Sequence, residues 1–235
     1  MQDEPQTESH GIGTLNEGPL HEELKQWYAR PGDRLEVPVE GYVVDIVRGD
    51  VLIEIQTGGF SAIKRKIRTL VANHKVRLVY PIARDRWIVR LDDDGRNVLG
   101  KRRSPKHGTV RDIFSELVRM PDVLARPDFS LDLLLTQEEE LRRHEPGRAW
   151  RRKGWIVVER RLVSVLESRP LRTVRDAASL LPADLPEEFT TLDVAEALAE
   201  PRTLAQRMAY CLRAMGAIQQ VGKQGRSVLY RRRAA

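Results

Sequence analysis

The segment of residues 41–66, GYVVDIVRGDVLIEIQTGGFSAIKRK, constrains the fold most because it sets charged and amide side chains inside apolar, β-branched runs. Such runs favour β-strands. Asp45 interrupts the first run, and Glu54 and Gln56 interrupt the second. A polar group buried in a strand costs about 2–7 kcal/mol unless a partner satisfies it. These three side chains therefore require a partner, and its chemistry bears on function.

Patterns on both sides of this segment predict an α/β fold. The first half predicts helices at 14–29 and 58–74, strands at 34–40, 41–49, 50–57 and 75–83, and a hairpin at 86–103. The second half predicts a helix at 108–120, a strand at 128–137 and one or two strands at 154–169. From Pro170 alanine-rich helical segments replace strands. We therefore expect a disordered segment at 1–13, one domain at 14–169 and a second at 170–235.

Residue spacing brings the polar side chains of the hairpin together. Glu54 and Gln56 are two residues apart and so project from one face of their strand. Asp45 lies on the preceding strand, and a hairpin brings such positions within several ångström of each other. Two carboxylates that converge in an apolar sheet repel unless a proton or a cation neutralises them. Mg²⁺ suits carboxylate oxygens, and Lys64 or Lys66 on the following helix can reach back towards a phosphate or water held there.

The order of elements over residues 14–83 resembles the core of the PD-(D/E)XK nuclease superfamily, which includes restriction endonucleases and Holliday junction resolvases. In that core a helix carries a Glu, a hairpin carries an Asp and then Glu-x-Lys, and a helix follows. Glu17 in NEGPLHEELK, Asp45 in VVDIV and Glu54 in LIEIQT match this pattern. The resemblance implies a restriction endonuclease-like mixed sheet flanked by helices, with Asp45 and Glu54 binding Mg²⁺ and Glu17 assisting. Gln56 stands at the family's lysine, so Lys64 is the expected substitute, and Gln56 and Lys64 would position the water and the phosphate.

Purely structural roles remain open for the same residues. Asp45 can form an ion pair with Arg48 or Arg68, and Glu54 and Gln56 can lie on the solvent side of a half-exposed strand. The acidic residue of the first helix has three candidates, Glu17, Glu22 and Glu23. The five histidines show no metal-ligand spacing, and most are expected at the surface.

The C-terminal residues 189–233 resemble a winged helix-turn-helix domain. Thr190 and Asp193 predict a capping box on a first helix, Thr203 begins a second helix, and the residues after it predict two strands around a turn at 222–225. The resemblance implies DNA as a ligand, and a protein–protein role remains open. The side chains expected to contact DNA are Arg202, Gln206, Tyr210 and Arg213 on the second helix, and Lys223 and Arg226 on the hairpin.

Charge and composition fit a nucleic-acid partner. The formal net charge of +6 favours a polyanion, and two basic stretches at 100–108 and 142–155 add to the same footprint. Cys211 is the single cysteine, which excludes an internal disulfide and predicts a cytoplasmic location. We expect no membrane partner, because no apolar run is long enough to span a bilayer.

These patterns together predict a Mg²⁺-dependent DNA endonuclease acting on duplex or branched DNA. The alternative is a non-catalytic DNA-binding regulator that keeps the nuclease-like scaffold, since fold does not establish function. Gln56 favours the alternative, whereas the pair of Asp45 and Glu54 opposes it. An RNA substrate and a homodimer remain open.

Overall fold

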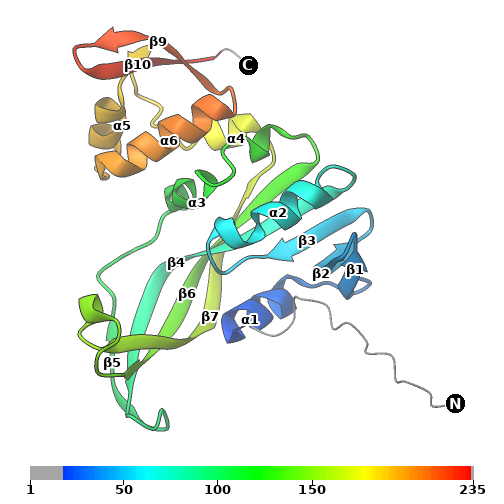
Figure 1. The fold of residues 1–235 in the computed structure, drawn as a ribbon. Coiled ribbons are helices and arrows are strands. Elements are labelled where there is room, and N and C mark those ends of the chain that lie inside the picture. The colour runs from blue at the N-terminus through cyan, green and yellow to red at the C-terminus, as the bar shows by residue number, and fades with distance from the viewer. Residues whose placement is uncertain (1–17, 234–235) are drawn as a thin grey trace, which may run out of the picture.

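The computed structural model describes residues 18–233 as a mixed α/β protein, with a seven-stranded mixed sheet flanked by helices (Figure 1). The predicted disordered segment at 1–13 and the candidate Glu17 lie outside the described residues. In the described part of the chain, none of the helices has the length and apolar character needed to cross a bilayer.

The first half of the sheet follows the predicted order. Helix α1 (Pro19–Tyr28) precedes the antiparallel strands β1 (Arg34–Val39), β2 (Tyr42–Arg48) and β3 (Val51–Ile55), and helix α2 (Phe60–Leu70) follows them. Gly41 and Gly49 make the tight turns with positive φ angles of 80° and 59°, which glycine adopts without steric cost. Strand β4 (Lys75–Leu91) then pairs parallel to β3.

Long strands extend the sheet into an arm. β4, β6 (Phe129–His144) and β7 (Trp155–Leu171) run past the helices in Figure 1, and β5 (Val98–Arg103) pairs with the far end of β4. The prediction of a strand at 75–83 separate from a hairpin beginning at 86 was wrong. Pairing with β6 resumes after a register shift between Ala83 and Asp85, so one strand spans both segments.

The predicted helix at 108–120 is much shorter in the structure. A capping box between Thr109 and Asp112 starts it as the 3-10 turn η1 (Val110–Ile113), and only one α-helical turn follows, α3 (Phe114–Leu117). A second 3-10 turn, η2 (Val123–Ala125), leads into β6, and η3 (Trp150–Arg152) lies between β6 and β7. Phe114 and Leu117 of the short α3 are fully buried, so packing in the apolar core, chiefly against α6 and α2, decides its position.

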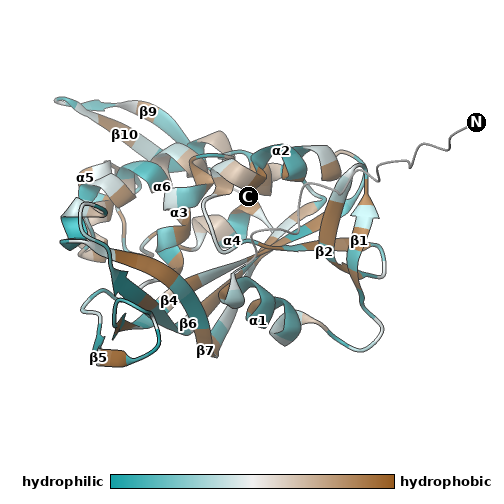
Figure 2. Cartoon of the chain, turned by 60° about the horizontal axis from the view of Figure 1, so that its bottom comes forward, coloured by the Kyte–Doolittle hydropathy of each residue, from teal (hydrophilic) through white to brown (hydrophobic). Residues whose placement is uncertain are grey.

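Helices cover both faces of the sheet. α1 packs on one face, where Leu20 and Leu24 meet Ile53 and other strand residues in a separate apolar cluster. α2 and α3 pack on the opposite face within the largest cluster. Figure 2 shows polar colouring over much of α1 and α2, with apolar stretches along the strands beneath. Asp45 and Glu54 therefore lie in strands enclosed by two layers of helices.

The C-terminal part follows β7 through α4 (Val174–Ala178). It contains β8 (Glu188–Phe189), α5 (Thr191–Leu198), α6 (Arg202–Ala214) and the hairpin of β9 (Ile218–Gln224) and β10 (Ser227–Arg232). The predicted capping box of Thr190 and Asp193 is confirmed. The hairpin turn is at 225–226, beyond the predicted start at 222, because β9 runs to Gln224 and pairs with Ser227. The pairing of β8 with β10 was not predicted.

The apolar core is continuous across the predicted boundary at 169/170. Met208 and Leu212 of α6 belong to the same buried cluster as Phe60 of α2 and Leu117 of α3. β7 ends at Leu171, close to that boundary. The division into two domains stays a prediction, but side-chain packing joins the two parts.

Removal of the Leu117 side chain should destabilise both parts together. Leu117 is fully buried between the sheet and α6, so Leu117→Ala should lower the free energy of unfolding by about 2–5 kcal/mol. The measurement is urea unfolding followed by tryptophan fluorescence and by circular dichroism. Leu192→Ala is the control, since Leu192 is 44% exposed, and it should change stability by less than about 0.5 kcal/mol. Two separate unfolding transitions in the wild-type chain would contradict the continuous core.

Candidate functional site

The regular pairing of β2 breaks on both sides of Asp45. The β2–β3 ladder ends at the pair of Ile46 and Ile53, so Asp45 and Glu54 would form the next pair. On the other side, Glu36 of β1 lies opposite Asp45 with a φ of 53° and takes no part in the β1–β2 ladder. A non-glycine residue at positive φ is strained, and such strain clusters at functional sites.

Asp45 is 5% exposed, and its carboxylate occupies the gap that this break leaves. The backbone N–H of Ile55 donates to Asp45 Oδ2 at 2.6 Å. His21 Nε2 of α1 lies 3.3 Å from the same oxygen. The alternative partner Arg48 pairs instead with Asp33, at 2.7 Å. Asp45 thus interacts with a strand amide and a histidine.

Glu54 is buried against Lys66 of α2. The carboxyl group is 2% exposed, and Lys66 Nζ lies 2.6 Å from Glu54 Oε2 and donates to the carbonyl oxygen of Val43 at 2.5 Å. Burial, and then the charge of Asp45, raise the pKa of Glu54 to about 8, while Lys66 acts in the opposite direction. Glu54 Oε1 has no hydrogen-bond partner among residues 18–233. A buried, unpaired carboxylate oxygen calls for a proton or a cation.

The remaining predicted residues lie outside this contact. Lys64 lines a shallow groove on the outer side of α2 with Arg65 and Arg68, and in the described chain it forms no ion pair with a carboxylate. The Gln56 amide donates to the carbonyl oxygen of Gly59 at 3.2 Å. The structure therefore brings together Asp45, Glu54 and Lys66, and leaves Gln56 and Lys64 outside this group.

Two acidic residues of α1 are engaged elsewhere. Glu23 accepts the N–H of Leu162 at 2.6 Å, and Glu22 lies 2.8 Å from Lys25. Both contacts are with residues outside the group of Asp45, Glu54 and Lys66. Helix α1 contacts this group through His21, which the sequence analysis treated as one of several surface histidines. His21 follows Leu20 and precedes Leu24 by three residues, and this spacing on the apolar face is the signal that could have identified it.

The donor set fits Mg²⁺ only if water and substrate complete the coordination. Within residues 18–233, no group of three or more His, Cys, Asp or Glu side chains is arranged to hold a metal ion. Mg²⁺ is commonly held by one or two carboxylates, together with waters and substrate phosphate oxygens. Asp45 and Glu54 can supply two carboxylates, and the unpaired Glu54 Oε1 is available to a cation.

A second candidate surface lies between α6 and the β9–β10 hairpin. A groove there has a volume of about 240 Å³. It collects most of the side chains predicted to contact DNA, although α6 and the hairpin are separate in sequence. Lys223 lies on β9 and does not line it. The predicted residues that line the groove are Arg202, Gln206, Tyr210, Arg213 and Arg226.

Comparison with known proteins gives a family and a relative. A family model described as "Domain of unknown function (DUF8091)" matches residues 18–172. An uncharacterized protein of Treponema pallidum (strain Nichols) is 31% identical over 225 residues, which cover 94% of this chain and 87% of that protein. No solved structure matches the chain. The family match ends one residue after β7, whereas the similarity to the Treponema protein continues into the C-terminal elements.

The buried Glu54 should make stability fall between pH 5 and pH 8. Its pKa is about 8 in the folded protein, against 4.5 for an exposed carboxyl. In this window the unfolded chain loses the proton that the folded chain keeps, so the free energy of unfolding decreases by up to about 1.4 kcal/mol per pH unit. The side chain at position 54 cannot titrate in Glu54→Gln. In urea unfolding without metal, this variant should therefore lack the decrease in the free energy of unfolding with pH.

Asp50→Asn is the control for this measurement. Asp50 lies in the turn between β2 and β3, and its hydrogen bond with Lys75 lowers its pKa. Its contribution is therefore already complete at pH 5 and constant above it. A stability difference between wild type and Glu54→Gln that stays flat from pH 5 to pH 9 would contradict the raised pKa.

Proposed function

This chain belongs to the DUF8091 family, and we propose that it is a Mg²⁺-dependent DNA endonuclease of the PD-(D/E)XK type. One observation carries the proposal. Four elements, α1, β2, β3 and α2, each contribute one ionisable side chain to a single buried cluster at the break in the β2 ladder. Those side chains are His21, Asp45, Glu54 and Lys66.

Each member of the cluster has a role in phosphodiester hydrolysis. Mg²⁺ bound by Asp45 and Glu54 would polarise the phosphodiester and lower the pKa of a water. The Ile55 N–H fixes the orientation of Asp45. Lys66, which is the most exposed member at 19%, supplies the positive charge that Gln56 lacks and can donate to the phosphate or the attacking water. His21 holds Asp45 from the side of α1.

We propose that residues 170–235 form a winged helix that holds duplex or branched DNA. Support comes from the groove between α6 and the hairpin, in which arginine, glutamine and tyrosine side chains converge. These residue types read base edges and bind phosphates.

We place the protein in the cytoplasm. Burial raises the pKa of Cys211 to about 12, so this thiol stays protonated and unreactive.

A second candidate function is DNA binding without cleavage. Burial favours it, because Glu54 is 2% exposed and Lys66 already occupies the position 2.6 Å from its Oε2. A substrate phosphate would have to approach past Lys66. The break in the β2 ladder favours the nuclease, because a scaffold kept only for stability gains nothing from two adjoining buried carboxylates.

Mg²⁺-dependent cleavage tests the first proposal. The full-length protein should nick or cut duplex or branched DNA with Mg²⁺ and not with EDTA. Asp45→Asn and Glu54→Gln should each lower the rate at least about a hundredfold, since each removes one metal ligand. Cleavage at the wild-type rate by both variants would refute the metal site. DNA binding without any cleavage would select the second candidate.

Two lysine variants on one helix decide which residue replaces the family's lysine. The resemblance to the nuclease core favours Lys64, whereas the contact with Glu54 favours Lys66. Lys66→Met should lower the cleavage rate strongly at unchanged DNA affinity, and Lys64→Met should affect mainly affinity. Circular dichroism of each variant checks that it is folded. The reverse ranking of cleavage rates would return the role to Lys64.

The groove along α6 should carry duplex affinity. Arg202→Ala or Arg213→Ala should weaken binding by about 1–3 kcal/mol if the side chain reads a guanine. Arg207→Ala is the matched control, because Arg207 lies on the same helix but donates to Ser115 Oγ of α3 at 2.8 Å. Binding is measured by fluorescence anisotropy at several salt concentrations. Equal losses in all three variants would show that the groove has no special part in binding.

A further inference from the structure

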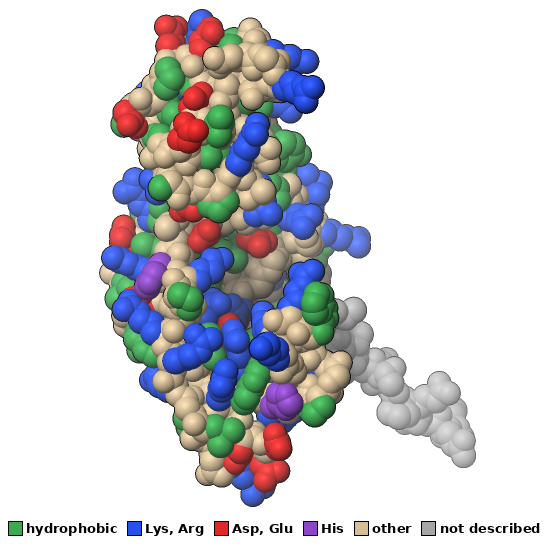
Figure 3. All heavy atoms as spheres, turned by 90° about the vertical axis from the view of Figure 1, so that its left-hand side faces the viewer, with side chains coloured by type: hydrophobic (Ala, Val, Ile, Leu, Met, Phe, Trp, Pro, Cys, Tyr) green, Lys and Arg blue, Asp and Glu red, His purple; other side chains and the backbone are tan. Residues whose placement is uncertain are grey.

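A polar cavity of about 390 Å³ lies at the base of the arm, apart from the carboxylate cluster. It lies between β4, β6 and β7, the segment 104–112 and α3. Figure 3 shows a hollow in this face of the molecule with many Lys and Arg side chains around it. Its charged and aromatic lining includes Tyr80, Arg86, Lys106, Glu138, Arg142 and Arg160.

The acidic residues of the cavity are engaged in structural contacts. Glu138 is 1% exposed and accepts a hydrogen bond from Thr136 Oγ1 at 2.8 Å. Glu116 accepts the N–H of Phe60, the first residue of α2, at 2.9 Å. Asp112 accepts the N–H of Thr109 at 3.0 Å. These contacts satisfy part of the hydrogen-bonding capacity of each carboxylate and fix its orientation.

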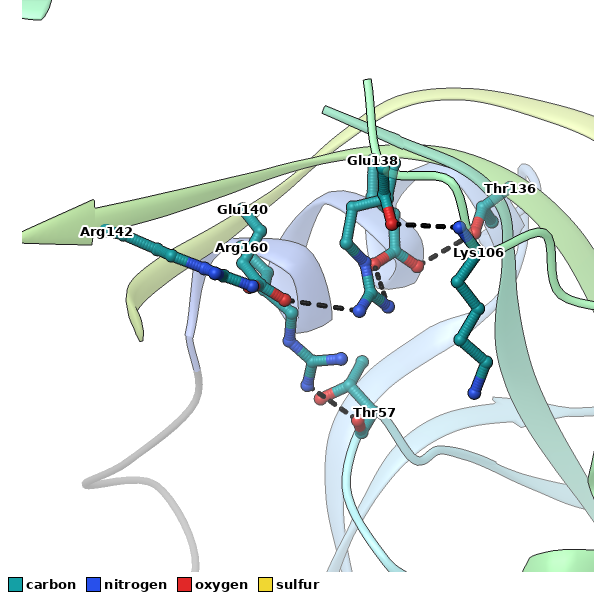
Figure 4. Close-up of polar contacts among 9 residues, drawn as sticks. Thr57, Lys106, Thr136, Glu138, Glu140, Arg142 and Arg160 are labelled. Carbon is teal, nitrogen blue, oxygen red and sulfur yellow. Dashed lines mark hydrogen bonds and ion pairs between the residues drawn. The ribbon is translucent and has the colours of Figure 1, made fainter. Parts of the chain in front are cut away.

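The cationic residues keep unused donors. Arg160 donates one N–H to the carbonyl oxygen of Thr57 at 2.7 Å, and a guanidinium carries five N–H donors. Arg86 lies 3.2 Å from Glu140 and 3.5 Å from Glu138, so two carboxylates share its guanidinium, and its Nε is buried without a hydrogen-bond partner in the described chain. Lys106 forms no ion pair among residues 18–233. Figure 4 shows the side chains of Lys106 and Arg160 extending towards the Thr57 segment from opposite sides.

The loop that carries Lys106 is fixed against β4. Gly108 donates to the carbonyl oxygen of Ala83 at 3.0 Å, and a Cβ on Gly108 would lie 2.6 Å from that oxygen. The N–H of Ser104 donates to the carbonyl oxygen of Arg86 at 2.7 Å. The loop therefore fixes the backbone of Lys106 beside the cavity, while its exposed side chain keeps the torsional freedom to reach an anion.

We propose that this cavity binds one phosphate-bearing nucleotide. Arg160, Lys106 and Arg86 bind the phosphate, since guanidinium groups match its oxygens and an ammonium adds a point charge. Tyr80 and the adjoining Pro81 and Ile82 supply an apolar surface for the nucleoside. The volume lies in the range of pockets that hold small ligands. The inference rests on the proposed function only for the source of the phosphate, either a strand terminus or the strand backbone.

Binding to the full-length protein without metal tests this inference independently of cleavage. The probes are deoxynucleoside 5′-monophosphates and a short single strand with a 5′-phosphate or a 5′-hydroxyl, measured by calorimetry in EDTA. Lys106→Ala and Arg160→Lys should each weaken binding about tenfold, the loss of one charge-assisted hydrogen bond. Lys101→Ala is the control, because Lys101 lies nearby on β5 but pairs with Glu139 at 2.6 Å.

The two strands distinguish the sources of the phosphate. Tighter binding of the 5′-phosphorylated strand, lost in Lys106→Ala, would identify a terminal phosphate. Equal binding of both strands, weakened by the same variant, would identify a backbone phosphate. Absence of binding, or binding unchanged by both Lys106→Ala and Arg160→Lys, would overturn the inference whether or not the protein cleaves DNA.

Discussion

The contact between Glu54 and Lys66 is the interaction on which the architecture of the site depends. It joins β3 to α2, and the hydrogen bond from Lys66 to the Val43 carbonyl joins α2 to β2 as well. Removal of one partner from a buried pair costs about 3–5 kcal/mol, because it leaves the other charge uncompensated. Well-packed apolar residues would stabilise the same elements at least as well. This comparison supports the proposal that the pair, with Asp45 next to it, serves a reaction rather than stability.

The long strands relate this site to the other two surfaces. β4 pairs with β3 next to Glu54, lines the polar cavity at Tyr80 and pairs with β5 at its far end. α3 lines one side of the cavity, and its Ser115 accepts a hydrogen bond from Arg207 of α6. The carboxylate cluster, the cavity and the groove along α6 are therefore held in one packed unit. A single nucleic-acid strand that contacted all three would meet a surface already organised before binding.

Part of this arrangement could be predicted from local sequence patterns. The alternation of side chains along the two strands predicted that Asp45 lies opposite Glu54. The periodicity of apolar residues in α2 predicted its apolar stripe. The choice between Lys64 and Lys66 could not be made in this way. The two residues flank the stripe on opposite sides, so the choice depends on how the helix crosses the sheet, which tertiary packing decides. The length of β4 was missed for a similar reason. Its charged middle, Arg84–Arg86, looks like a turn until pairing with β6 is known.

The segment of residues 56–59 explains how a departure at Gln56 can be tolerated. Gln56 donates its backbone N–H to the Val79 carbonyl and its amide to Gly59, so it closes the turn between β3 and α2. Arg160 donates a hydrogen bond to the carbonyl oxygen of Thr57, and Glu116 accepts the N–H of Phe60, the first residue of α2. The start of α2 is thereby fixed, and with it the position of Lys66 two turns later. In the proposed site a lysine on α2 would supply the charge while the hydrogen bond from Gln56 to Gly59 stays in place. Because Arg160 lines the polar cavity and donates to the Thr57 carbonyl oxygen, a nucleotide bound in that cavity would contact a residue that also binds the segment positioning Lys66.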